Sequence, residues 1–157
     1  MRSETVLGEL AAAAAGNGRL AAVEAWASAG FMTPLHAHGS DEAVIVLEGS
    51  MTIFAGEDVV RLLPGETFIV AEGIAHAYRA EAPGTRAVFS TFAPSSGRYE
   101  DFLRAAGPVA VDPSGTPTWS HDEDAGAVAA IAAAADATVL GPPGMLPTGS
   151  RDSARAA

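Results

Sequence analysis

The chain has 157 residues, 48% of them hydrophobic, and carries nineteen acidic residues against nine basic ones, all arginine, for a formal net charge of −10. This length suits a single domain with a substantial core, and the acidic balance excludes nucleic acid as a partner because no basic cluster is present to neutralise phosphates. There is no cysteine, so disulfides, thiolate ligands and a cysteine nucleophile are excluded, and any metal must be held by His, Asp or Glu.

The N-terminal segment, residues 1–19, is apolar but is interrupted by Glu4 and Glu9, and it has only one arginine ahead of them. A signal peptide needs an uninterrupted apolar stretch, and a membrane span needs about 18 to 20 apolar residues, which the chain nowhere has. We therefore expect a cytoplasmic protein with no membrane partner. The segment has no obvious place in a single core, which makes it a candidate for a strand exchanged between two protomers.

Residues 20–95 are a succession of short β-like runs such as "EAVIVLEG" and "TFIVAEG", rich in Val, Ile, Thr and Phe and punctuated by Gly and Pro. One pair of runs predicts a hairpin that turns at residues 56–58. Many short strands with no intervening helix favour an antiparallel sandwich or barrel. The fold class is therefore predicted as all-β.

The sequence pattern changes after Pro94, from short β-like runs to segments with helix signals. The stretch "SGRYEDFLRAAG" spaces its apolar residues for one face of a short helix, and "SHDEDAGAVAAIAAAADA" opens with a capping box at Ser120 and Glu123 before a run of alanine. We predict a helical C-terminal appendage over 96–140. The tail, 141–157, is rich in Gly, Pro and Ser, and we expect it to be flexible.

Two histidines, His36 and His38, are separated by one residue, so on a strand both side chains project from the same face. Glu42 follows the turn-like triplet 39–41, which can bring its carboxylate back to the same point. His76 lies on another predicted strand that can reach the same interior spot. Each piece has a plainer interpretation, as a surface histidine pair or a partly buried histidine, so the metal hypothesis depends on their joint placement.

These residues resemble the two sequence motifs of the cupin family. Ala71 and Ala80 depart from the family pattern, which usually has proline and asparagine there, but neither position is a metal ligand in the family. The resemblance implies a cupin double-stranded β-helix, or jelly-roll, barrel over 20–95. The matching positions are Gly30, His36, His38, Glu42 and Gly49 in the first motif and Gly65, Gly73 and His76 in the second.

The resemblance further implies that His36, His38, Glu42 and His76 bind one divalent transition metal. Three imidazoles and a carboxylate suit Fe, Mn, Ni, Co, Cu or Zn, and in six-coordination they leave two positions for substrate or dioxygen. One carboxylate on a divalent ion leaves a formal charge of +1, which matches an enolate, phenolate or carboxylate. We therefore expect a small anionic or phenolic substrate.

Strand parity predicts the substrate pocket. If His36 and His38 point inward, the same alternation carries neighbouring side chains to that face, although parity through the turn at Gly39 is open. Tyr78, two residues after His76, is the candidate for a catalytic role beside Glu42, because a phenol next to a metal can donate a hydrogen bond or a proton. The predicted pocket residues are Met32, Pro34, Val44, Val46 and Tyr78.

Three classes of function remain open. We favour a metal-dependent dioxygenase of a small aromatic or polyphenolic substrate, because the layout, with "RYEDFLRAAG" after the barrel and a late "VLGPPG", resembles quercetin dioxygenase-like cupins. The alternatives are a non-oxidative cupin isomerase, cyclase, lyase or decarboxylase of natural-product metabolism, and a non-enzymatic cupin that binds a small molecule. We also expect a homodimer, because sheet edges leave unpaired backbone groups that a second protomer can cover.

Overall fold

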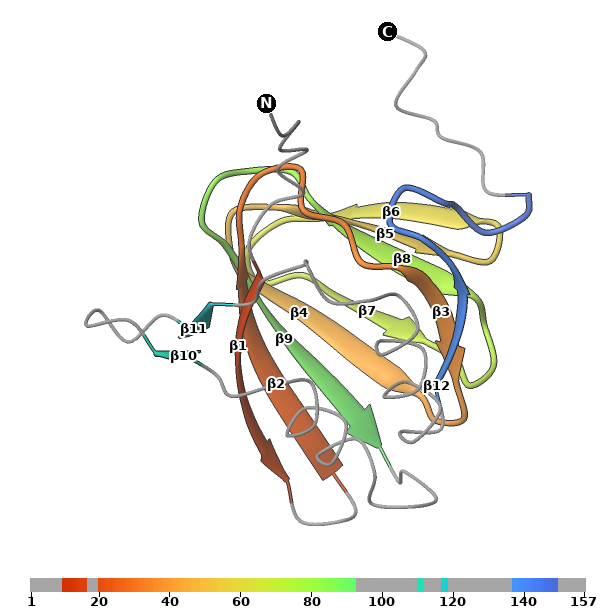
Figure 1. The fold of residues 1–157 in the computed structure, drawn as a ribbon, viewed down its shortest axis with the longest axis horizontal. Coiled ribbons are helices and arrows are strands. Elements are labelled where there is room, and N and C mark those ends of the chain that lie inside the picture. Colours follow the sequence, from red (N-terminus) through yellow and green to blue (C-terminus); the bar gives the residue numbers. More distant parts are fainter. Residues whose placement is uncertain (1–9, 17–19, 93–109, 112–116, 119–136, 150–157) are drawn as a thin grey trace, which may run out of the picture.

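Antiparallel strands make up the regular secondary structure in the described part of the chain (Figure 1). The computed structural model describes residues 10–16, 20–92, 110–111, 117–118 and 137–149. Within these ranges no helix occurs. The described residues therefore contain no helix that is long and apolar enough to cross a bilayer. The all-β prediction is confirmed for this part of the molecule.

The first sheet has five strands and contains the longest ones. All its pairings are antiparallel. The strand β4 (Glu42–Glu48) lies between β9 (Thr85–Phe92) and β7 (Thr67–Val70), so Glu42 begins an interior strand and not an edge strand. In spatial order the sheet consists of β1 (Leu10–Gly16), β2 (Leu20–Ala27), β9 (Thr85–Phe92), β4 (Glu42–Glu48) and β7 (Thr67–Val70).

The second sheet, also of five antiparallel strands, carries the three histidines of the sequence motifs. The predicted hairpin is confirmed, since β5 (Met51–Ala55) and β6 (Asp58–Leu62) are joined by a turn at Gly56 and Glu57, with Gly56 at a φ of 57°. A separate two-stranded ribbon joins β10 (Ala110–Val111) to β11 (Pro117–Thr118). The second sheet consists, in order, of β12 (Ala137–Gly141), β3 (Leu35–His38), β8 (His76–Ala80), β5 (Met51–Ala55) and β6 (Asp58–Leu62).

The main core lies between the two sheets. Val44 and Val46 from β4 meet Ile53 from β5 and Tyr78 from β8, and all four side chains are buried. A second cluster packs Phe54 and Ala77 with Met32, Leu35 and, from the C-terminal segment, Leu146. Side chains of successive residues on a strand point to opposite faces, so Phe54 and Ala77 place this cluster on the other face of the second sheet.

The C-terminal region differs from the prediction where the structure describes it. The sequence predicts a helical appendage that runs to residue 140, but residues 137–140 belong to β12, which pairs with β3 next to the histidines (blue in Figure 1). The β-branched residues Thr138 and Val139, just before a Gly-Pro-Pro sequence, favour a strand over continuation of an alanine-rich helix. The segment 141–149, predicted as flexible tail, contributes Leu146 to the second cluster.

Other predictions fall outside the described residues or stay untested. The two C-terminal helices fall on 93–109 and 119–136, which lie outside the described ranges. The proposed exchanged strand is β1, which here pairs with β2 of the same chain from Leu10 opposite Ala27 to Gly16 opposite Ala21. This pairing adds a strand to the first sheet ahead of the predicted barrel boundary at residue 20.

Candidate metal centre

The pairing of β3 with β8 brings the histidines of the two sequence motifs together. His36 and His76 are register partners in the antiparallel ladder, and their ring centroids lie 4.2 Å apart. His38, two residues along β3, has its ring centroid 4.8 Å from that of His76. One strand pairing thus brings together histidines that lie far apart in the sequence.

The backbone fixes the orientation of each imidazole. In every case Nδ1 lies within hydrogen-bonding distance of a carbonyl oxygen two residues away: 2.8 Å to Pro34 for His36, 2.8 Å to Ser40 for His38 and 2.7 Å to Ile74 for His76. A carbonyl only accepts, so Nδ1 carries the proton and the Nε2 lone pair is free. Such backbone bonds are typical of metal-ligating histidines.

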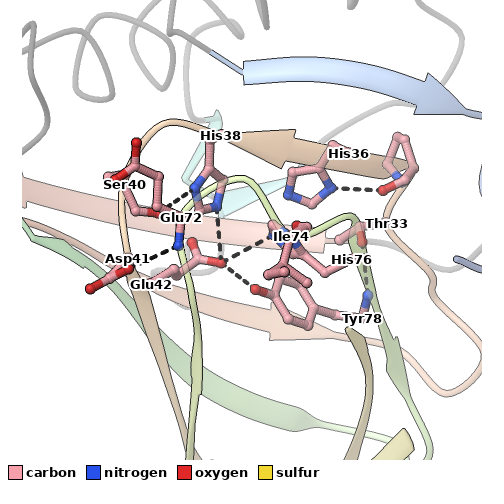
Figure 2. A network of polar contacts seen from close by, with 11 residues as sticks. Thr33, His36, His38, Ser40, Asp41, Glu42, Glu72, Ile74, His76 and Tyr78 are labelled. Carbon is pink, nitrogen blue, oxygen red and sulfur yellow. Dashed lines mark hydrogen bonds and ion pairs between the residues drawn. The ribbon is translucent and has the colours of Figure 1, made fainter. Parts of the chain in front are cut away.

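The free ring nitrogens converge on one point, as Figure 2 shows. The ligand atoms of His36, His38 and His76 lie within 4.8 Å of one another. The Nε2 atoms of His38 and His76 are buried and have no hydrogen-bond partner, which is costly for a polar atom. The three imidazoles thus form a group that could hold a divalent metal, and one ion would satisfy the orphaned nitrogens.

Glu42 adds a carboxylate to the histidine cluster from the opposite sheet. It is the first residue of β4, its side chain is 2% exposed, and its Oε2 lies 3.6 Å from Nε2 of His38 and 3.6 Å from Nε2 of His76. The phenol of Tyr78 donates a short hydrogen bond to the same oxygen (Figure 2). The carboxylate thus stands beside both orphaned nitrogens.

Burial and mutual charge shift the proton equilibria of these groups. Burial lowers the pKa of His36 to about 4, and the neighbouring His76 adds to the effect. Burial also acts to lower the pKa of His38, but its interaction with the Glu42 carboxylate outweighs it and raises that pKa above its usual value. Burial would raise the pKa of Glu42, yet contacts with His38 and His76 hold it well below its usual range. The carboxylate is therefore ionised, as a metal ligand must be.

Two further contacts, which the sequence did not suggest, join the end of β3 and the turn that follows it to the loop before β8. Asp41 Oδ1 accepts a hydrogen bond from the backbone N–H of Glu72 at 2.8 Å, and the N–H of Gly73 donates to the carbonyl of His38 at 2.9 Å. Gly73 adopts a φ of 75°, a conformation that favours glycine. Two hydrogen bonds therefore hold the end of β3 and the turn that follows it against the loop before β8.

The predicted pocket residues fall into two groups. Val44, Val46 and Tyr78 share the core cluster between the sheets, on the same face as Glu42 and His76 by strand alternation. Met32 instead packs in the second cluster with Ala77, because β3 begins only at Leu35 and its alternation does not extend back to residue 32. Pro34 contributes the carbonyl that orients His36. The structure thus does not bring Met32 together with the other pocket residues.

Two packed antiparallel sheets with a histidine cluster between them define a jelly-roll protein with a candidate metal centre. Residues 23–92 match the family model of the cupin domain. Among curated proteins, none matches the chain.

Several solved structures resemble this chain. An RmlC-like cupin from Shewanella frigidimarina NCIMB 400 is 26% identical with a TM-score of 0.50, and the match covers 59% of this chain and 80% of that one. KdgF from a Halomonas species is 21% identical with a TM-score of 0.50, covering 52% and 77%. A cupin superfamily protein from Desulfitobacterium hafniense DCB-2 is 16% identical with a TM-score of 0.50, covering 59% and 81%. These likenesses show a common fold.

Proposed function

We propose that the protein is a metal-dependent cupin enzyme, and specifically a dioxygenase that acts on a small aromatic or polyphenolic substrate. The observation that carries the proposal is the convergence of three Nε2 lone pairs beside one buried carboxylate. In this proposal His36, His38, His76 and Glu42 hold the ion. A bound redox metal of this kind supplies Lewis-acid polarisation of a substrate oxygen and one-electron chemistry with dioxygen.

Charge favours an anionic substrate in spite of the acidic protein. The chain carries a formal charge of −10, but the histidines are neutral when they act as ligands, so Glu42 alone offsets a divalent ion. The resulting formal charge of +1 lies in a buried region, where it attracts a phenolate more strongly than it would in water. This argument supports binding of a deprotonated hydroxyl at the centre.

Glu42 and Tyr78 supply the proton chemistry in this proposal. The carboxylate is ionised and can accept the proton of a substrate hydroxyl, while the Tyr78 phenol donates to the same carboxylate and compensates its charge. Val44, Val46 and Phe89 surround the phenol with apolar side chains, and the Tyr78 and Phe89 ring centroids lie 5.0 Å apart. Apolar walls of this kind keep water from a reactive substrate anion.

Oxygen uptake with a flavonol, after the metal content has been measured, tests the proposal directly. Metal-loaded protein should consume dioxygen in proportion to the flavonol converted. Glu42→Gln should regain metal occupancy in excess metal, because three imidazoles remain, yet its rate should stay about 10²- to 10⁴-fold lower because the amide cannot accept a proton. Full recovery of the rate on metal addition would show that Glu42 serves only as a ligand.

The Tyr78 to Glu42 hydrogen bond also favours a second candidate, a non-oxidative isomerase, cyclase, lyase or decarboxylase. A phenol paired with a carboxylate can pass a proton between two positions of a substrate without dioxygen. Anaerobic incubation separates the two candidates. Turnover that persists without dioxygen supports the second, and turnover that stops and resumes on re-aeration supports the dioxygenase.

A further inference from the structure

Thr91 lies opposite Glu42 on the interior face of the first sheet. The two residues are register partners in the β4 and β9 pairing, and cross-strand partners project from the same face, with Cβ atoms about 4.5 to 5.5 Å apart. Further along β9 the same face carries Ala87 and Phe89, which are both in the main core. Thr91 therefore continues this inward row to the level of the metal centre.

The hydroxyl of Thr91 has no hydrogen-bond partner among the residues that the structure describes. Thr91 is 1% exposed, and its Oγ1 is buried without a hydrogen bond. Among the described residues, the buried side-chain nitrogen and oxygen atoms in this state are this oxygen and the Nε2 atoms of His38 and His76. A buried hydroxyl without a partner is destabilising relative to a methyl group of the same shape. All three orphaned atoms thus belong to residues at or next to the candidate centre.

A second threonine on the same strand shows the contrast. Thr85 lies in the same inward row, is fully buried, and its Oγ1 donates to the carbonyl of Ala82 at 2.7 Å, with the carbonyl of Ser50 at 3.1 Å. The hydroxyl of Thr85 therefore has a structural role within the protein. Thr91 has the same residue type, strand and face, but its hydroxyl makes no hydrogen bond within the described part of the chain.

We propose that Thr91 determines ligand specificity by donating a hydrogen bond to the second oxygen of a ligand whose first oxygen is held at the metal centre. The ligand class is a small molecule with two neighbouring oxygens, such as a catecholate. This inference rests on the proposed metal-dependent function. The inference adds a hydrogen-bond donor to the proposed site. This donor, the Thr91 hydroxyl, comes from the first sheet and lies beside Glu42.

The first arm of the test needs neither metal nor ligand. Thr91→Val removes the hydroxyl and keeps the shape, so the melting temperature of the metal-free protein should rise by several degrees. Thr85→Val is the matched control and should lower the melting temperature, because it removes the hydroxyl that donates to the carbonyl of Ala82. A decrease for Thr91→Val comparable to that for Thr85→Val would overturn the proposal by showing a structural role.

The second arm measures ligand binding by visible absorption of the Co²⁺-loaded protein under anaerobic conditions. Catechol carries the second oxygen and phenol lacks it. Thr91→Val should weaken catechol binding about three- to tenfold and change phenol binding less than about twofold, while Thr91→Ser keeps catechol affinity near that of the wild type. Equal catechol affinity in wild type and Thr91→Val would refute the role.

Failure of the proposed function has a separate signature. If wild-type protein gives no Co²⁺ spectrum before catechol is added, the metal centre itself is wrong, and the role of Thr91 is overturned with it. If the Co²⁺ spectrum forms and Thr91→Val binds catechol and phenol with unchanged affinities, only the role of Thr91 is overturned.

Discussion

Replacing Tyr78 by Phe tests how the buried carboxylate of Glu42 is stabilised. The two side chains are 3% and 2% exposed, and the phenol donates a hydrogen bond to Glu42 Oε2. Hydrogen bonds to charged groups contribute about 1.5 to 3 kcal/mol. Because burial excludes water as a replacement donor, we expect the upper part of this range: Tyr78→Phe should lower the free energy of unfolding of the metal-free protein by about 2 to 3 kcal/mol.

Urea unfolding at pH 7 measures this loss, and Thr52→Val is the matched control. Thr52 also donates a hydroxyl hydrogen bond to a carboxylate, that of Glu81, but the Glu81 side chain is 22% exposed and keeps its ion pair with Arg79. The control should therefore lose only about 0.5 to 1.5 kcal/mol. The reasoning is refuted if Tyr78→Phe costs no more than Thr52→Val.

Three further predictions concern pH, backbone conformation and assembly. Affinity for Co²⁺ should increase from pH 6 to pH 8, because the raised pKa of His38 means that the metal must displace a proton from this residue at low pH. His36, with a pKa of about 4, is already neutral in this range. Calorimetry that finds no pH dependence of the affinity would contradict this prediction. Gly49→Ala should lower the free energy of unfolding, measured in urea, by about 3 kcal/mol or more, because its φ is +73° and the new Cβ would lie 2.8 Å from the Cα of Thr85. The control Gly84→Ala, at a φ of +65° with open space around it, should lower it by about 1 kcal/mol, and equal losses would be inconsistent with the clash. We propose a homodimer, so light scattering should return twice the 15.8 kDa chain mass, and a value equal to that mass would rule it out.

The sequence was sufficient to predict that the histidines would meet. The alternation of side chains on a strand places His36 and His38 on one face, and the all-β texture made it reasonable that His76 would come from a neighbouring strand. The structure shows this neighbour to be β8, paired with β3 at His36 and His76. Parity could be followed within strands because it is a local property of the backbone.

The same reasoning did not succeed where local patterns end or compete. Parity counted back from His36 placed Met32 in the pocket, but residue 32 precedes β3 and packs on the other side of the second sheet. The predicted helical appendage runs to residue 140, but its last residues, 137–140, pair with β3 as a strand. Thr91 could have been found, since the alternation that makes Phe89 inward also applies to residue 91, but its missing partner is visible only in three dimensions.

Metal stoichiometry of the wild type and His76→Ala tests the central claim most directly. Protein purified without added metal, then incubated with Co²⁺ and passed over a desalting column, is analysed for metal per chain. Wild type should retain one ion, and His76→Ala, which loses the ligand closest to both other histidines, should retain almost none while remaining folded by circular dichroism. Wild type that retains no metal, or a folded His76→Ala with equal occupancy, would contradict the account.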